Sequence, residues 1–414
     1  MTDLLEMGKR AKAASGALAA AGPKKNAALL AAAEELERVA GGILSANAED
    51  LAAAKASGMR EALLDRLALS RERVHGMADG LRSVAAQPDP VGQVISGITR
   101  PNGLRIEKVR VPLGVIGIIY EARPNVTSDA AAICLKAGSA VLLRGGKEAL
   151  RTNTAVEAAL RRALTGAGLP ADCVQLVHDT SHASADAMMN LTGYLDVLIP
   201  RGGKDLIRAV SEHARVPVIK TGWGNCHIYV DASADPAMAA NIVFNAKTSR
   251  PSVCNAAESL LVHRDIAERA LPVIKKRLDE KKVELRGCER TRAILGDCVV
   301  PATEEDYGAE YLDYIMSVKV VDSIGEAIAH IARYSSGHSE AIVTRNYENA
   351  RRFVNEVDSA AVYVNASTRF TDGGEFGLGA EIGISTQKLH ARGPMGAAEL
   401  TTTKFIVTGD GQIR

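Results

Sequence analysis

The chain has 414 residues, of which 47% are hydrophobic and 24% charged, and its formal net charge is +1. This length accommodates two or three domains of roughly 100–200 residues, and the composition is typical of a globular enzyme. The near-zero charge gives no indication of a surface for nucleic acid or for membranes.

The termini and the cysteines indicate a cytoplasmic protein. The N-terminal segment lacks the basic and apolar regions of a signal peptide, and no apolar run approaches the roughly 18 residues of a membrane-spanning helix. The six cysteines are scattered, without a CxxC pair or a metal-like spacing. We therefore expect a reduced protein without a bound metal.

Residues 3–88 are predicted to be helical. Leu29, Ala33 and Leu36 recur at helical spacing with charged residues between them, and Pro88-Asp89-Pro90 ends the block. A hairpin follows, in which Ser96–Arg100 and Leu104–Val111 flank the turn dipeptide Asn102-Gly103.

From Val115 onward, short apolar segments alternate with helical ones, which predicts parallel sheets covered by helices. The first set of predicted strands is Val115–Tyr120, Ala140–Leu143, Val174–Val177, Val197–Ile199 and Val216–Lys220. The second set is Ile228–Val230, Ser259–His263, Val318–Val320, Ala341–Val343 and Ala361–Val364. The simplest interpretation is an α/β protein with two parallel-sheet domains in series, followed by a C-terminal strand at Leu400–Val407.

Cys254 is the cysteine with the most reactive surroundings. It lies in a polar loop between a helix that ends near Lys247 and an apolar strand, and Lys247 and Arg250 would favour its thiolate. Cys134, in contrast, lies within an apolar helix and is interpreted as structural. Local context alone leaves both a catalytic and a structural role open for Cys254.

Two glycine-containing turns follow predicted strands, where free N–H groups and a helix dipole favour a phosphate. They are Arg144-Gly145-Gly146-Lys147 and Arg201-Gly202-Gly203. Neither matches GxGxxG, so an ordinary strand-to-helix turn remains an alternative at each.

Several segments, in this order, resemble the aldehyde dehydrogenase superfamily. Pro112–Gly117 resembles the strand that opens its cofactor domain, and Ala137–Arg144 resembles its ribose-contacting strand and turn. Cys254 falls where the superfamily has its nucleophile, and Glu310 matches the carboxylate that binds the nicotinamide ribose.

A closer resemblance, over almost the whole chain, is to the γ-glutamyl phosphate reductase branch. It rests on the segments Tyr120–Thr127, Lys220–His227, Arg250–Asn255, Ala327–Ile331, Ser336–Ser339 and Phe376–Ser385. The implied fold has a Rossmann-like NADPH-binding domain at 1–227, interrupted by the hairpin at about 95–111. A catalytic domain at 228–365 carries Cys254, and 366–414 forms a return segment and an oligomerisation strand.

The resemblance implies NADPH-dependent reduction of L-glutamyl 5-phosphate to glutamate 5-semialdehyde, with release of phosphate, through a Cys254 thioester in proline biosynthesis. The position of the glutamate base in hydrolytic relatives corresponds to Thr221, which argues against an aldehyde-to-acid oxidase. The Cys254 N–H and the amide of Asn125 or Asn255 are candidate donors to the oxyanion.

The anionic substrate and cofactor require cations. Arg123, Lys247 and Arg250 are candidates for the substrate, although any of them could be a solvated surface charge. Lys147 would attract the 2′-phosphate of NADPH. No catalytic role is assigned to His227, His330 or His338, and for His330 a packing role is preferred.

The resemblance also implies a homodimer or homotetramer, built through the C-terminal strand, and makes substrate handover from glutamate kinase plausible. The competing hypotheses are a CoA-acylating aldehyde dehydrogenase and a non-catalytic dinucleotide-binding regulatory protein.

Overall fold

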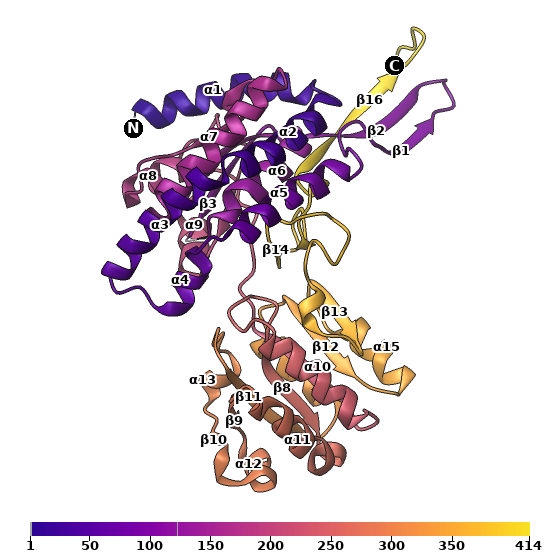
Figure 1. Ribbon diagram of the computed structural model, residues 1–414. Coiled ribbons are helices and arrows are strands. Elements are labelled where there is room, and N and C mark those ends of the chain that lie inside the picture. Colours follow the sequence, from indigo (N-terminus) through magenta and orange to yellow (C-terminus); the bar gives the residue numbers. More distant parts are fainter. Residues whose placement is uncertain (1, 122) are drawn as a thin grey trace. The chain divides into compact units, whose positions relative to one another are not determined.

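The computed structural model describes residues 2–121 and 123–414, so Ala122 of the Tyr120–Thr127 segment lies outside the described residues. The chain forms two compact units (Figure 1). The first unit comprises Met1–Thr221, Gly377–Gly383 and Pro394–Arg414, and the second comprises Gly222–Phe376 and Ile384–Gly393. The change from the first unit to the second therefore falls at Thr221/Gly222, and residues 366–414 are divided between both units.

The predicted N-terminal helices are present and belong to the first unit. They are α1 (Thr2–Ala19), α2 (Lys24–Arg38), α3 (Ala40–Ala56), α4 (Glu61–Leu67) and α5 (Arg71–Ala86). Small and aliphatic side chains such as Ala28, Leu29 and Ala32 are buried where α2 packs against its neighbours. Ser70 caps α5 by accepting a hydrogen bond from the N–H of Arg73, which satisfies one of the free donors of the first turn.

The first unit contains a four-stranded parallel sheet of order β5-β4-β3-β6. Its elements are β3 (Val115–Tyr120), α6 (Asn125–Lys136), β4 (Ala140–Arg144), α7 (Leu150–Gly166), β5 (Val174–Leu176), α8 (His182–Met189), β6 (Val197–Arg201) and α9 (Lys204–His213). Every residue of β3 is buried, as expected of a central parallel strand covered on both faces. The chain runs outward from β3 to β5 and then returns to the other side of β3 at β6. Such a reversal of strand order is where open α/β sheets bind ligands.

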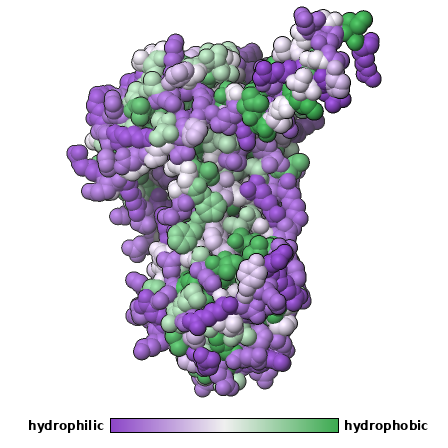
Figure 2. Space-filling view, turned by 90° about the vertical axis from the view of Figure 1, so that its right-hand side faces the viewer, coloured by the Kyte–Doolittle hydropathy of each residue, from purple (hydrophilic) through white to green (hydrophobic). Residues whose placement is uncertain are grey.

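A separate antiparallel sheet of order β1-β2-β16 forms an arm of the first unit (Figures 1 and 2). It contains β1 (Val94–Thr99), β2 (Arg105–Pro112) and β16 (Thr401–Thr408). Gly103, in the predicted turn, has a φ of +89°, a conformation that costs glycine little. The pairing of β16 with β2 confirms that the C-terminal strand joins the hairpin.

The second unit is built on a seven-stranded parallel sheet of order β10-β9-β11-β8-β7-β12-β13. Its strands are β7 (Cys226–Val230), β8 (Ala257–His263), β9 (Glu284–Gly287), β10 (Val300–Pro301), β11 (Ile315–Val321), β12 (Ser339–Val343) and β13 (Ala361–Val364). Its helices are α10 (Pro236–Thr248), α11 (Arg264–Asp279), α12 (Glu289–Leu295), α13 (Glu304–Tyr307), α14 (Ile324–Tyr334) and α15 (Tyr347–Glu356). The short strands β14 (Ile384–Ser385) and β15 (Gly393–Pro394) pair in the return segment.

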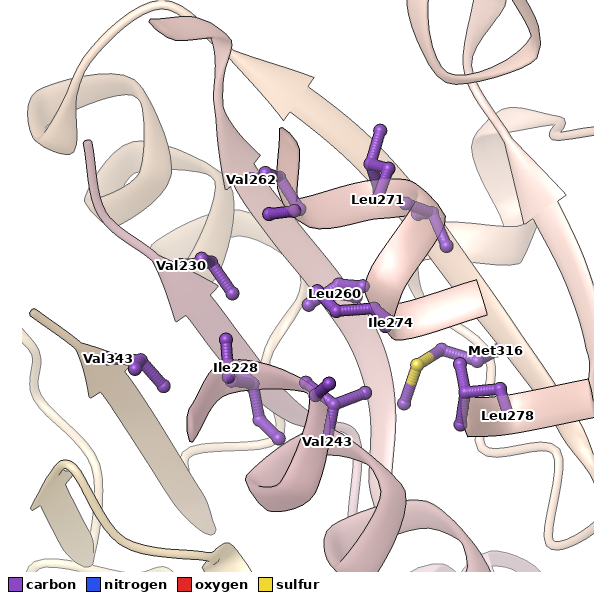
Figure 3. Packing of buried hydrophobic residues seen from close by; sticks show 14 of the residues in the cluster. Ile228, Val230, Val243, Leu260, Val262, Leu271, Ile274, Leu278, Met316 and Val343 are labelled. Carbon is purple, nitrogen blue, oxygen red and sulfur yellow. The ribbon is translucent and has the colours of Figure 1, made fainter. Parts of the chain in front are cut away.

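The core of the second unit lies on both faces of this sheet. On one face, Ile228 and Leu260 of the sheet pack with Ile274 of α11 and Val243 of α10 (Figure 3). On the other face a smaller cluster is formed by Tyr229, Leu261, Ile342 and Phe353, among others. Because alternate residues of β7 and β8 point to opposite faces, both strands are apolar along most of their length.

One predicted strand differs from the structure. Val216–Lys220 forms only an isolated parallel bridge, between Val218 and Leu198, because Pro217 has no N–H to donate to a ladder. The short strands β9 and β10 were not predicted. Among the described residues, no helix has both the length and the apolar character needed to cross a membrane.

Candidate active site

The two glycine turns of the first unit lie at one edge of its sheet. Arg144 ends β4 and Arg201 ends β6, and both strands flank β3 in parallel, so their carboxyl ends meet at the same edge. The turns Gly145-Gly146 and Gly202-Gly203 follow directly. The structure thus brings seven of the eight predicted cofactor residues to one edge of one sheet, and the eighth, Glu310, belongs to the second unit.

Two buried donors beside the turn after β4, one at the end of β4 and one in α7, have no acceptor among the described residues. A β-carbon on Gly145 would lie 2.3 Å from Nδ2 of Asn153 and 3.1 Å from the Tyr120 ring, so this turn requires glycine. Asn153 Nδ2 and Arg144 Nε are buried and hydrogen-bond to no described residue. Buried donors are normally satisfied, and orphaned ones beside a glycine turn are compatible with a bound dinucleotide. The remaining Arg144 contacts, from Nη2, go to the carbonyls of Thr180 and Ser181.

Lys147 and Glu121 give the two turns different charges. Lys147 is exposed and forms no ion pair with any residue that the structure describes. At the other turn, the Glu121 carboxylate accepts a hydrogen bond from the N–H of Gly203 at 2.9 Å, at the start of α9. A phosphate at that helix terminus would have to displace the carboxylate, whereas the turn that leads to Lys147 has an unpaired cation.

Cys254 lies in the second unit, in the loop between α10 and β8, and its side chain is half-buried. Asp235 starts α10 by accepting hydrogen bonds from two N–H groups of its first turn. The Cys254 carbonyl accepts a hydrogen bond from Sγ of Cys226 at 3.2 Å. The Cys254 N–H donates to no group among the described residues, so it is available to an oxyanion.

Three of the other five cysteines have surroundings that suppress reactivity. Burial raises the pKa of Cys134, Cys173 and Cys226, so their thiols stay protonated at neutral pH. Cys288 is half-buried beside Thr291, and Cys298 is exposed. The backbone of Cys254 is contacted by Gly224 and Cys226, which belong to the segment Lys220–His227 that the resemblance singled out.

Asn255 holds the loop of Cys254 in place. Its Nδ2 donates to the carbonyls of Arg369 and Thr371, at 3.3 and 2.9 Å. The backbone carbonyl of Asn255 accepts a hydrogen bond from the hydroxyl of Thr368 at 2.7 Å. Both amide hydrogens are therefore committed to protein acceptors. This differs from the expectation that Asn255 donates to the oxyanion, because its side chain braces the loop instead.

Lys247 also differs from the expected substrate cation. It is fully buried, and its ammonium donates to Oε2 of the equally buried Glu258 at 2.5 Å. Burial lowers the pKa of Lys247, and burial raises the pKa of Glu258 to about 7. Glu258 Oε1 also accepts the N–H of Leu312 at 3.2 Å. The pair thus braces the segment that carries Glu310.

Glu310 contacts the segment before β7. Its Oε1 accepts the N–H of Gly224 at 2.7 Å. Arg250 is exposed in the Cys254 loop. Asn125 and Arg123 belong to the first unit, where Asn125 is exposed at the start of α6 and donates to Asp129 at 2.9 Å. The substrate and oxyanion roles of these residues stay predictions.

Thr221 is the residue that the resemblance places where hydrolytic relatives have their glutamate base. It is buried, and its hydroxyl donates to the carbonyl of Pro200 at 2.6 Å, so this side chain supplies no carboxylate. His227, His330 and His338 are all buried in the second unit. His330 packs edge-on against Tyr307 and His227, which agrees with the packing role preferred for it.

Sequence reasoning missed three residues around Cys254. Gly224, Glu258 and Arg369 lie 30 residues before, 4 after and 115 after Cys254 in the chain. Gly224 was within a recognised segment but had no role assigned. Glu258 directly precedes the predicted strand Ser259–His263 and had no role assigned, and nothing local to Arg369 connects it to a thiol.

The fold agrees with the comparisons to known proteins. The model of the aldehyde dehydrogenase family matches residues 2–293. The chain belongs to the aldehyde dehydrogenase family, a family of oxidoreductases that use a nicotinamide cofactor.

Within that family, the chain is a member of the γ-glutamyl phosphate reductase group. It is 60% identical to γ-glutamyl phosphate reductase of Moorella thermoacetica over 408 residues, which cover 98% of this chain and 97% of the relative. The crystal structure of the enzyme of that name from Thermotoga maritima superimposes with a TM-score of 0.96 at 52% identity, covering 99% of each chain. An acetylating aldehyde dehydrogenase from Geobacillus thermoglucosidasius shares the fold, with a TM-score of 0.72 at 16% identity over 100% of this chain and 98% of that chain.

Proposed function

We propose that this protein reduces L-glutamyl 5-phosphate to L-glutamate 5-semialdehyde with NADPH, through a thioester on Cys254, and releases inorganic phosphate. The observation that carries the proposal is the half-buried Cys254 in its braced loop. The chain that carries this loop matches relatives named γ-glutamyl phosphate reductase over almost their whole length. This reaction is the second step of proline biosynthesis from glutamate.

In the first half of the reaction, the Cys254 thiolate attacks the γ-carbonyl carbon. The S–C bond forms, the C–O bond to the phosphoryl group breaks, and phosphate leaves with the electron pair. The oxyanion of the tetrahedral intermediate is stabilised by the free N–H of Cys254, with Asn125 as the candidate second donor. Removing one such donor typically costs about a hundredfold or more in kcat.

In the second half, bound NADPH would supply the hydride that reduces the thioester carbonyl. The resulting thiohemiacetal collapses, expels the Cys254 thiolate and releases the aldehyde. The hydroxyl of Thr221 is bonded to Pro200 and no carboxylate stands at this position to activate water. The thioester is therefore protected from hydrolysis and, in the reverse direction, reacts with phosphate.

The arrangement of the first unit supports binding of the dinucleotide at the turns after β4 and β6. Arg144, Gly145, Gly146 and Lys147 would hold the adenosine half, with the unpaired Lys147 at the 2′-phosphate. Glu310, whose Oε1 accepts the N–H of Gly224, would bind the nicotinamide ribose.

The test is the reverse reaction, in which glutamate 5-semialdehyde reduces NADP⁺ with and without inorganic phosphate. We expect turnover that requires phosphate and that is lost in Cys254→Ala. Cys298→Ala is the matched control, because Cys298 is the exposed cysteine, and it should keep full activity. Turnover without phosphate, or undiminished turnover in Cys254→Ala, would contradict the proposal.

The same assay separates the alternatives. If CoA replaces phosphate as the acyl acceptor, the protein is a CoA-acylating enzyme. The likeness to the acetylating aldehyde dehydrogenase is a likeness of fold alone and does not favour that alternative. If the folded protein binds NADPH but turns over with neither acceptor, it is a binding protein. The expected assembly is a homodimer or homotetramer, and direct handover from glutamate kinase would be seen as complex formation between the two purified enzymes.

A further inference from the structure

Arg369 is attached to both ends of the Cys254 loop. It lies in the short helical turn η4 (Thr368–Phe370) after β13. Its Nε donates to Oγ of Ser249 at 3.0 Å, before Cys254, and its Nη1 donates to Oδ1 of Asn255, directly after Cys254. In return, the Asn255 amide donates to the Arg369 carbonyl. The guanidinium is thereby fixed to the loop that carries the thiol.

The charge of Arg369 has no carboxylate partner. Among the described residues, neither Arg369 nor Arg250 has an acidic group within ion-pair distance. Burial lowers the pKa of Arg369, whereas the charges of Asp372 and of the Cys254 thiolate raise it. A half-buried arginine without a counterion is a ready receptor for an anion.

The guanidinium also has free donors. An arginine side chain has five N–H groups in a planar fork, and here two of them are donated to protein acceptors. The remaining three face no acceptor among the described residues. A planar fork of this kind matches two oxygens of a phosphate group.

We propose that Arg369 binds the phosphoryl group of the acyl phosphate, and of inorganic phosphate in the reverse direction, next to the Cys254 sulfur. This inference rests on the proposed function. The phosphoryl group is bonded to the carbonyl carbon that the sulfur attacks, whereas the α-carboxylate of the substrate lies three carbons farther away. When the C–O bond breaks, negative charge builds up on the departing phosphate, and the guanidinium stabilises it there.

The experiment measures the reverse reaction in three variants. Arg369→Gln removes the charge, Arg369→Lys keeps the charge without the fork, and Arg352→Gln removes an exposed arginine of α15 that pairs with Glu356. We expect the KM for phosphate to rise about 10- to 100-fold in Arg369→Gln. The rise should be smaller in Arg369→Lys and absent in Arg352→Gln. The KM values for glutamate 5-semialdehyde and NADP⁺ should change less than about twofold.

A second measurement does not depend on turnover. Inorganic phosphate should slow the alkylation of Cys254 by iodoacetamide in the wild type and in Arg352→Gln, and not in Arg369→Gln. The alkylation of Cys254 without phosphate also reports whether the loop is intact in each variant.

Three results would overturn the inference. The first is an unchanged KM for phosphate in Arg369→Gln. The second is a selective rise of the KM for the semialdehyde, which would assign Arg369 to the α-carboxylate. The third is equal protection of Cys254 by phosphate in the wild type and in Arg369→Gln. Failure of the wild type to turn over with phosphate would contradict the proposed function instead, and the protection assay would still report on phosphate binding.

Discussion

Gly224 lies directly against the backbone of Cys254. A β-carbon on Gly224 would stand 1.5 Å from the Cys254 carbonyl oxygen and 2.6 Å from its α-carbon. The N–H of Gly224 donates to Glu310, and the N–H of Leu312, two residues after Glu310, donates to the buried Glu258. The position of the thiol therefore depends on a chain of contacts within the second unit that reaches from Glu258 to Gly224.

Substitution of Gly224 tests this dependence. In Gly224→Ala the added methyl group must push the Cys254 loop away, because no flexible side chain can yield. A displacement of about 1 Å at a reacting group can cost roughly a hundredfold in rate, so we expect kcat to fall by at least that factor.

Gly308→Ala is the control for this substitution. A β-carbon there would meet its nearest neighbours at 3.9 Å, which is ordinary contact. Activity within twofold of the wild type is expected for Gly308→Ala. A fully active Gly224→Ala enzyme would show that the loop adjusts freely and that the contact has no catalytic consequence.

The buried pair of Lys247 and Glu258 predicts an asymmetric effect on stability. Lys247→Met leaves the Glu258 carboxylate buried without its ammonium, and breaking such a pair typically costs about 3–5 kcal/mol. Removing both charges, in Lys247→Met/Glu258→Leu, should cost clearly less. Denaturant unfolding of the three proteins gives the free energies of unfolding.

Equal destabilisation by the single and the double variant would contradict this prediction. It would mean that the shape of the Lys247 side chain, and not its charge, supports the loop.

Much of the architecture could be predicted from local patterns. The strands at Val115–Tyr120 and Ala361–Val364 have the bounds that their apolar runs predicted. Every residue of Val115–Tyr120 is buried, and a strand covered on both faces leaves a continuous hydrophobic signal. The pairing of β16 with the hairpin was inferred from the family resemblance and is confirmed. The strand expected at Val216–Lys220 was wrong because Pro217 removes a ladder donor.

The surroundings of Cys254 were less accessible from the sequence. Lys247 was predicted to be a substrate cation because it is close to Cys254 in the sequence. In the structure Lys247 lies on the buried face of α10 and pairs with Glu258 of β8. Arg369 contacts the loop from more than a hundred residues away. Such contacts arise from the order of strands in the sheet, which no local spacing specifies.

His330 predicts a dependence of stability on pH. Burial, with the nearby charges of His227, Lys319 and Arg333, lowers the pKa of His330 to about 3, and both its ring nitrogens lack a partner among the described residues. Between pH 3 and 6.5 the unfolded chain binds a proton that the folded chain does not. Stability from this group is therefore complete above pH 6.5 and is lost as the pH falls.

The variant His330→Phe keeps the aromatic packing and removes the titration. Between pH 6.5 and 5 the wild type should lose about 1.6 kcal/mol more of its free energy of unfolding than the variant does. Urea unfolding at both pH values measures the difference. Parallel losses in both proteins would show that His330 is not the group responsible.

The arm of the first unit predicts self-association. Phe405 is 66% exposed and Val407 56% exposed on β16, and Val94 and Ile98 of β1 are each 54% exposed. In the described chain β1 and β16 are the outer strands of the arm sheet, so both edges are unpaired. Apolar open edges of this kind are normally covered by another chain, and we expect a second copy.

Light scattering coupled to size exclusion tests the association. The wild type should exceed the 43.6-kDa mass of one chain, and Phe405→Glu/Val407→Glu should shift it to the monomer. Ile413→Glu, beyond the strand, is the control and should not dissociate it. A wild-type monomer at micromolar concentration would exclude assembly through this arm.

The charge at residue 147 predicts the preference between the two nicotinamide dinucleotides. Lys147 is exposed, follows the turn after β4 and has no carboxylate partner among the described residues. In Lys147→Glu the new carboxylate repels the 2′-phosphate of NADP⁺ and can bind the ribose hydroxyls of NAD⁺. We expect the ratio of kcat/KM for NADP⁺ to that for NAD⁺ to fall about tenfold or more, which corresponds to about 1.4 kcal/mol.

Lys281→Glu makes the same charge change on an exposed lysine of the second unit and should leave the ratio unaltered. If both variants leave the ratio unaltered, the adenosine phosphate is bound elsewhere, and the turn after β6 with Arg201 becomes the site to test.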